Sequence, residues 1–115
     1  MNLRRGVLVL AVAGLAVVPS ALGATAHTKT INVGDDYFGP TKVTVKKGTT
    51  IKWVWGEEDF DSHDVKLKSG PKGVSKFHSA SAAQDYTFSK KLTKVGTYKI
   101  VCTLHQDMGM TIKVV

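Results

Sequence analysis

The residues with the richest chemistry lie together near the C-terminal end of the chain. Residues 102–110 hold the only cysteine, Cys102, together with His105, Met108 and Met110. A thiolate and a thioether are soft metal ligands, and imidazole binds copper well. These ligand types in one short segment favour a copper ion, which cycles between Cu(I) and Cu(II).

The ligand spacing also suits copper that exchanges single electrons. Cys102 and His105 are close enough to share one tight turn, and Met110 follows in the same segment. His63 is the candidate for a second imidazole, delivered from elsewhere in the chain. Two imidazoles, a thiolate and a weak axial thioether form a site whose geometry changes little between oxidation states.

Apolar and polar residues alternate along most of residues 29–115, without a useful helical periodicity after the first 26 residues. The expected strands span 29–33, 41–47, 50–55, 63–67, 84–89, 96–102 and 110–115, with a long connection over 68–83. Short strands separated by turn signals predict an all-β, antiparallel Greek-key β-sandwich of about 7–8 strands. We expect one domain with no internal repeat.

Strand parity predicts that three candidate ligands point into the sandwich. Residues i, i+2 and i+4 of a strand share a face. The residues of equal parity are His63 with Val65 and Leu67, Cys102 with Tyr98 and Ile100, and Met110 with Ile112 and Val114. Each candidate ligand therefore faces the same side as its apolar neighbours. His105 lies between strands, so parity does not give its direction.

The N-terminal residues predict a cleaved signal peptide. Residues 1–5 are basic, residues 6–18 are apolar without charge, and Ala24-Thr25-Ala26 offers a small-x-small cleavage pattern. We expect a signal peptide over 1–26 and a mature copper-binding domain over 27–115, exported to the periplasm or the cell exterior. A retained membrane anchor is the alternative, although the apolar run is shorter than the usual span of about 20 residues.

Export makes the single cysteine informative. In an oxidising compartment a lone cysteine cannot form a disulfide within its own chain. It is then buried, reactive, paired with another chain, or bound to a metal. Simple burial is the usual fate, and the neighbours of Cys102 are what favour a metal.

The charge balance indicates the kind of partner. The chain has sixteen Lys and Arg residues against nine Asp and Glu residues, and Arg4 and Arg5 lie in the predicted signal. Residues 27–115 therefore keep fourteen lysines, a net charge of +5. Without arginine or a basic helix, nucleic-acid binding is not expected. Scattered lysines instead predict a soluble surface that steers toward redox partners with an acidic docking surface.

These features together resemble the cupredoxins, the type 1 (blue) copper proteins of the plastocyanin, pseudoazurin and amicyanin group, over residues 29–115. The similar segments are 37–40, 43–48, 51–53, 62–65, 96–98, 102–105 and 108–110. The resemblance implies one copper ion held by His63, Cys102, His105 and a methionine. It also implies a monomeric electron carrier that is not an enzyme.

The resemblance leaves the axial methionine open. Plastocyanin and pseudoazurin place it where Met110 stands, and amicyanin places it where Met108 stands. Parity favours Met110, and Met108 is then expected to be exposed beside the copper. It would contribute with Leu104 and Gly39-Pro40 to an apolar docking patch.

Two residues depart from the family pattern. Leu104 stands where a proline often precedes the loop histidine, and Asp64 stands where an asparagine often follows the first histidine. A carboxylate accepts hydrogen bonds but does not donate them unless protonated. We therefore predict that Asp64 accepts a hydrogen bond from the hydroxyl or the backbone amide of Thr103.

Two other functions are alternatives for the same residues, copper delivery and copper-dependent catalysis. A copper-binding or delivery protein without fast electron transfer would have the same site. A copper oxidase or nitrite reductase needs histidines beside the cysteine, where Val101 and Thr103 stand, and a binuclear centre needs two cysteines. His78 is expected to be exposed on the long connection, and His27 would be the N-terminal residue after cleavage.

Overall fold

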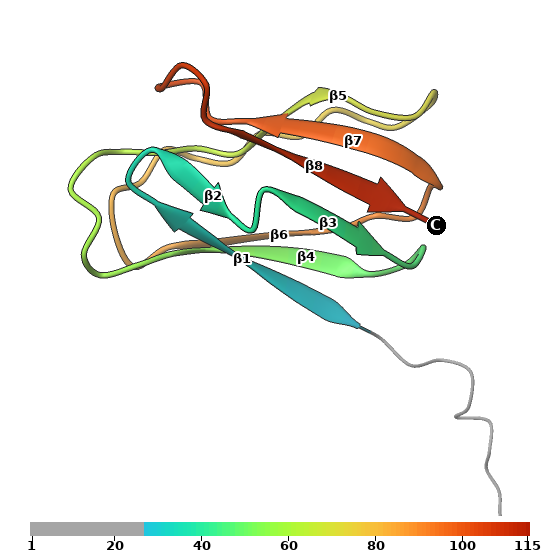
Figure 1. The fold of residues 1–115 in the computed structure, drawn as a ribbon, viewed down its shortest axis with the longest axis horizontal. Helices are drawn as coiled ribbons and strands as arrows, with labels where there is room; N and C mark the ends of the chain where they lie inside the picture. Colours follow the sequence, from blue (N-terminus) through green and yellow to red (C-terminus); the bar gives the residue numbers. More distant parts are fainter. Residues whose placement is uncertain (1–26) are drawn as a thin grey trace, which may run out of the picture.

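The structure is a computed structural model that describes residues 27–115. Two β-sheets pack face to face (Figure 1). Their strands are β1 (Thr28–Gly34), β2 (Tyr37–Gly39), β3 (Lys42–Val45), β4 (Thr50–Trp55), β5 (Lys66–Ser69), β6 (Thr87–Lys91), β7 (Gly96–Val101) and β8 (Gly109–Val114). The predicted signal peptide over 1–26 lies outside the described residues.

The strand order is β2-β1-β4-β6 in one sheet and β3-β8-β7-β5 in the other. This arrangement confirms the predicted all-β sandwich. Most neighbouring strands are antiparallel, but each sheet also holds one parallel pair, β1 with β4 and β3 with β8. Alternation along a strand does not indicate these pairs, because the partners are distant in sequence and parity does not depend on strand direction.

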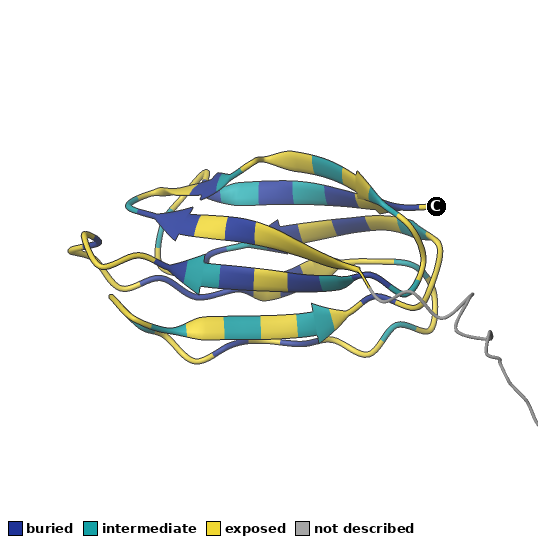
Figure 2. Ribbon diagram, turned by 90° about the horizontal axis from the view of Figure 1, so that it is seen from below, coloured by how far each residue is buried: buried dark blue, intermediate teal, exposed yellow. Residues whose placement is uncertain are grey.

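The core lies between the sheets and follows the alternation of the sequence. Figure 2 shows buried and exposed residues alternating along the strands. Trp53 is central, with its ring centroid 5.8 Å from that of Phe88 and 6.2 Å from that of Phe77. Within residues 27–115, no helix is long and apolar enough to cross a membrane.

Several segments differ from the expected strands. The strand expected over 84–89 is β6, which begins at Thr87 and ends at Lys91. Residues 37–39, which lie between two of the expected strands, form the short strand β2, which pairs with β1 across a turn at Asp35-Asp36. Asp36 has a φ of 66°, in the left-handed region that short polar residues tolerate in turns. The expected strand over 63–67 begins only at Lys66, and His63 forms an isolated bridge with Ala82.

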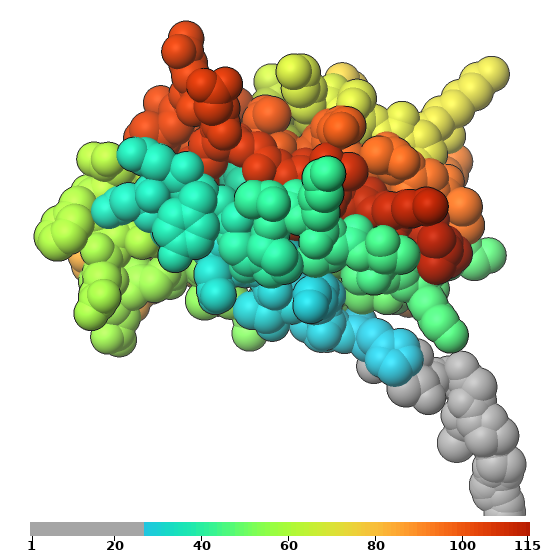
Figure 3. Space-filling view, viewed as in Figure 1, coloured from blue at the N-terminus to red at the C-terminus, as the bar shows by residue number. Residues whose placement is uncertain are grey.

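Three connections gather at one end of the sandwich. They are the β1–β2 turn, the β4–β5 loop and the β7–β8 loop (Figure 1). The space-filling view shows the teal β1–β2 turn, the green β4–β5 loop and the red-orange β7–β8 loop at that end (Figure 3). The candidate ligands His63, Cys102 and His105 belong to two of these loops.

Candidate metal centre

The structure brings three of the predicted ligands together. One donor atom each from His63, Cys102 and His105 lies within 4.8 Å of the other two. The Cys102 Sγ atom is 3.6 Å from the His105 Nδ1 atom, and the centroids of the two imidazole rings are 4.7 Å apart. The cysteine is buried and unpaired. Thiolate and imidazole donors at this spacing can hold a single copper ion.

Backbone hydrogen bonds hold His63 in place without a contribution from a metal. Its amide donates to the carbonyl of Ala82 at 2.9 Å, and its own carbonyl accepts from the amide of Ala82 at 3.0 Å. The indole Nε1 of Trp55 donates to the same carbonyl at 3.2 Å. These bonds compensate for the missing strand and hold the imidazole inside the fold.

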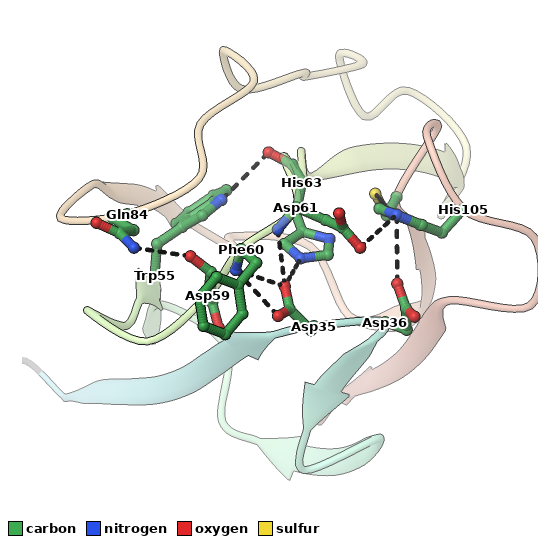
Figure 4. Close-up of polar contacts among 10 residues, drawn as sticks. Asp35, Asp36, Trp55, Asp59, Phe60, Asp61, His63, Gln84 and His105 are labelled. Carbon is green, nitrogen blue, oxygen red and sulfur yellow. Dashed lines mark hydrogen bonds and ion pairs between the residues drawn. The ribbon is translucent and has the colours of Figure 1, made fainter.

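Within residues 27–115, only one of the two ring nitrogens of His63 has a hydrogen-bond partner (Figure 4). The Nε2 atom lies 2.9 Å from Asp35 Oδ1, whereas the Nδ1 atom has no hydrogen-bond partner among the described residues although the side chain is 0% exposed. A buried polar group without a partner destabilises a protein by about 1–3 kcal/mol. This orphaned nitrogen beside the Cys102 thiol fits a bound metal, which would use its lone pair.

Asp35 ties the β1–β2 turn to the β4–β5 loop. Its carboxylate accepts hydrogen bonds from the backbone amides of Phe60, at 3.0 and 3.2 Å, and of Asp61, at 3.1 Å, as well as from His63. The hydrogen bond from His63, followed by that from Phe60, holds the pKa of Asp35 below its usual value. The carboxylate is therefore ionised at neutral pH.

His105 is the more exposed histidine, with 24% of its side chain accessible to solvent. Its Nδ1 atom faces the thiol, and its Nε2 atom lies 3.2 Å from Asp36 Oδ1 and 3.8 Å from Asp61 Oδ2. Both carboxylates are themselves largely exposed. His105 thus connects the buried thiol with the surface.

Met110 is buried on β8, and its register partner on β7 is Ile100. This agrees with the inward direction that parity predicts for Met110. Leu104 is 50% exposed, as expected for an apolar patch beside the loop histidine.

Met108 is buried as well, with 2% exposure, so the expectation that it would be exposed is wrong. Its carbonyl accepts a hydrogen bond from the amide of Cys102 at 2.9 Å, which draws the residue into the fold. Alternation did not reveal this because Met108 lies in a loop, directly after Asp107 with its left-handed φ of 62°.

The predicted contact between Asp64 and Thr103 is confirmed. The buried carboxylate accepts from the Thr103 amide at 2.7 Å and from the Thr103 hydroxyl at 2.5 Å. Asp64 therefore braces the segment between Cys102 and His105 against the β4–β5 loop. A carboxylate replaces an amide here without losing the connection.

The third partner of Asp64, His78, was not anticipated. Its Nε2 atom lies 2.8 Å from the carboxylate, while its side chain remains half exposed, as expected. A buried carboxylate needs several hydrogen-bond donors. An aspartate next to His63, which is predicted to point inward, is therefore the sequence signal for a further donor. Burial raises the pKa of Asp64, but the hydrogen bonds from His78 and Thr103 outweigh it and leave that pKa below the usual value.

His27 lies away from this centre. It precedes β1, and its carbonyl accepts from the amide of Thr50 at 2.9 Å, at the end of β4 opposite to Trp55. In the part of the chain that the structure describes, the one further grouping with metal-ligand spacing is Asp36, Asp61 and His105, which shares a histidine with the centre above.

Comparison with known proteins points to a copper-binding family. The profile of the family described as "Copper binding proteins, plastocyanin/azurin family" matches residues 25–115. Chloroplastic plastocyanin from Chlamydomonas reinhardtii is 34% identical over an aligned length of 119 residues, covering 93% of this chain and 80% of that protein. Amicyanin from Paracoccus versutus is 33% identical over 72 residues, covering 63% of this chain and 52% of that protein.

Solved structures of amicyanin share the fold. A reduced Cu(I) form of an amicyanin variant has a TM-score of 0.65 and 22% identity, covering 84% of this chain and 88% of that chain. Another reduced amicyanin variant has a TM-score of 0.67 and 21% identity, covering 83% of this chain and 89% of that chain.

Proposed function

This chain belongs to the plastocyanin/azurin family of copper-binding proteins, and we propose that it is an exported carrier of single electrons between redox proteins. Its cofactor is copper, and at the level of the family it is a blue copper protein of the electron-transfer type. We assign His63, Cys102, His105 and Met110 as the ligands. The orphaned Nδ1 of buried His63 beside the Cys102 thiol is the observation that carries this assignment.

The residues around the site have distinct tasks in this proposal. When bound, copper supplies the one-electron couple between Cu(I) and Cu(II). His63 and Cys102 hold it in a dry pocket, since both side chains are buried. The partly exposed edge of His105 provides the path to a partner, and the neighbouring Leu104 provides apolar contact around that edge.

The lysines support an acidic docking surface on the partner. Lys42, Lys68 and Lys99 line a shallow depression on the β3-β8-β7-β5 sheet together with Met110. An acidic partner seated there would contact the face of the sheet that covers the proposed axial ligand. Electrostatic attraction of this kind accelerates encounter and weakens as salt screens the charges.

Electron transfer can be measured directly on the mature protein, residues 27–115. Loaded with copper, it should exchange electrons rapidly with a small acidic redox protein in stopped-flow experiments, and the rate should fall as ionic strength rises. Slow transfer combined with ready release of copper to a chelator would contradict the proposal and indicate a delivery protein.

Export is tested separately from redox chemistry. The protein expressed from its full sequence should be recovered outside the cytoplasm with a new N-terminus at His27. Recovery of uncleaved protein in the membrane fraction would contradict the predicted removal of residues 1–26.

A further inference from the structure

Two consecutive aspartates in the β1–β2 turn each approach one of the two histidines. Asp35 Oδ1 lies 2.9 Å from the Nε2 atom of His63, and Asp36 Oδ1 lies 3.2 Å from the Nε2 atom of His105 (Figure 4). Both contacts are made to the ring nitrogen that the proposed copper ligation leaves free. The side chains of one short turn therefore contact both imidazoles.

The turn is held in place from several sides. The register between β1 and β2 pairs Gly34 with Tyr37 directly across it. The Tyr37 ring lies over Gly34 so closely that a Cβ atom at this position would clash with the ring. The amides of Phe60 and Asp61 add their hydrogen bonds to Asp35. Within the part of the chain that the structure describes, the Asp36 carboxylate has no such backbone partners, and it is largely exposed.

A carboxylate on the distal nitrogen has two chemical effects. A neutral imidazole has one N–H group, and donating it from Nε2 to a carboxylate leaves the lone pair on Nδ1 for a ligand. The carboxylate also makes the imidazole a more basic ligand. Negative charge near the centre stabilises a doubly charged ion more than a singly charged one.

We propose that the Asp35-Asp36 turn is the positioning and tuning element of the metal centre. Asp35 selects the tautomer of His63 that can bind copper, and both carboxylates favour Cu(II) over Cu(I), which lowers the reduction potential. Asp35 has the larger effect, because it is held by backbone amides and acts on a fully buried ring. This inference rests on the proposed electron-transfer function.

The test compares three variants that each remove one negative charge: Asp35→Asn, Asp36→Asn and Asp85→Asn. Asp85 is exposed outside the three loops of the centre and has a positive φ that asparagine also tolerates, so it is the matched control. The readouts are the affinities for Cu(II) and Cu(I), measured by competition with chelators, and the reduction potential.

Asp35→Asn should weaken Cu(II) binding about 10–100-fold, the usual effect of losing such a partner, with a smaller effect on Cu(I). Each tenfold loss of Cu(II) affinity relative to Cu(I) affinity raises the reduction potential by about 59 mV. Asp36→Asn should move the potential in the same direction by less, and Asp85→Asn should leave it unchanged. A merely structural role would lower the thermal stability without this selective change in Cu(II) affinity.

The inference fails if Asp35→Asn retains the blue spectrum with an unchanged affinity ratio, or if Asp36→Asn or Asp85→Asn has the larger effect. Should Asp35→Asn not fold, the comparison of Asp36→Asn with Asp85→Asn still decides whether the turn tunes the site. Failure of the proposed function is a different result, because the wild-type protein itself would then lack a reducible blue band.

Discussion

The two histidines of the metal centre lie beside each other but differ in their surroundings. His63 is completely buried, anchored by an exchange of backbone hydrogen bonds with Ala82, and bonded to a carboxylate that backbone amides hold. His105 is partly exposed, belongs to the same short loop as the thiol, and meets carboxylates that are themselves exposed. This difference indicates that the His63 imidazole is held rigidly, whereas the His105 imidazole connects the centre with the surface.

The largest test of this comparison removes each imidazole in turn. His63→Gly and His105→Gly should both lose the blue absorption of the copper protein, because each removes one proposed ligand. Free imidazole in the buffer should restore it in His105→Gly, whose vacated position is open to solvent. It should not do so in His63→Gly, where the position is sealed and the Asp35 carboxylate loses its partner.

Visible absorption during a titration with imidazole measures this difference. Cys102→Ser is the control, since added imidazole cannot replace its thiolate. Equal recovery in both glycine variants would show that the two histidines are not distinguished by access, against the comparison.

The two buried methionines after His105 test which of them is the axial ligand. Met110→Leu should raise the reduction potential clearly, because the axial thioether is one of the groups that set it. Met108→Leu should change the potential much less. Both swaps conserve volume in buried positions, so each should lower stability by less than about 1.5 kcal/mol. A larger shift in Met108→Leu would assign Met108 as the axial ligand.

The brace between the two histidine loops should have a moderate effect. Asp64→Ala removes the charged acceptor of the Thr103 amide, the Thr103 hydroxyl and the His78 ring. A hydrogen bond to a charged group contributes about 1.5–3 kcal/mol, so the apoprotein should lose stability of that order in urea unfolding. His78→Ala should cost less, since its ring is half exposed. Asp64→Asn tests whether this contact affects copper binding. An unchanged copper affinity and an unchanged reduction potential would contradict the role of Asp64 as a brace of the ligand loop.

Two buried carboxylates of the β4–β5 loop should respond to pH in opposite directions, the smallest effect expected here. The pKa of Asp64 is lowered, so the stability it contributes is present above the unfolded value of about 3.9 and is lost as the pH falls through its folded pKa. Burial, and then the charge of Asp35, raises the pKa of Asp59, whose ionised form therefore destabilises the fold.

Urea unfolding of the apoprotein between pH 7 and pH 3 checks these signs. Asp59→Asn should be more stable than wild type at pH 7, and the gain should disappear below pH of about 3.9, where both states of Asp59 are protonated. Asp64→Asn should show a shallower loss of stability in acid than wild type. Parallel pH curves for all three proteins would contradict the two assignments.

The sequence predicted the parts of the centre that strands deliver. The inward directions at Cys102 and Met110 follow from a two-residue period, which is a local property of each strand. The contact between Asp64 and Thr103 was predicted from the chemistry of a carboxylate in the place of an amide.

Contacts between loops could not be predicted from strand periodicity. Asp35 meets His63 across 28 residues of sequence, and no periodicity links a turn to a loop at that separation. The burial of Met108 depends on a left-handed residue and a backbone hydrogen bond, neither of which alternation reveals. The parallel pairing of β3 with β8 depends likewise on how the whole chain folds.

The most direct test of the central claim is a titration of the purified mature protein with Cu(II), followed by its visible spectrum. An intense blue band that saturates at one copper per chain, disappears in Cys102→Ser and bleaches on reduction is the predicted result. If no charge-transfer band forms and the Cys102 thiol still reacts freely in the presence of copper, the metal centre proposed here is wrong.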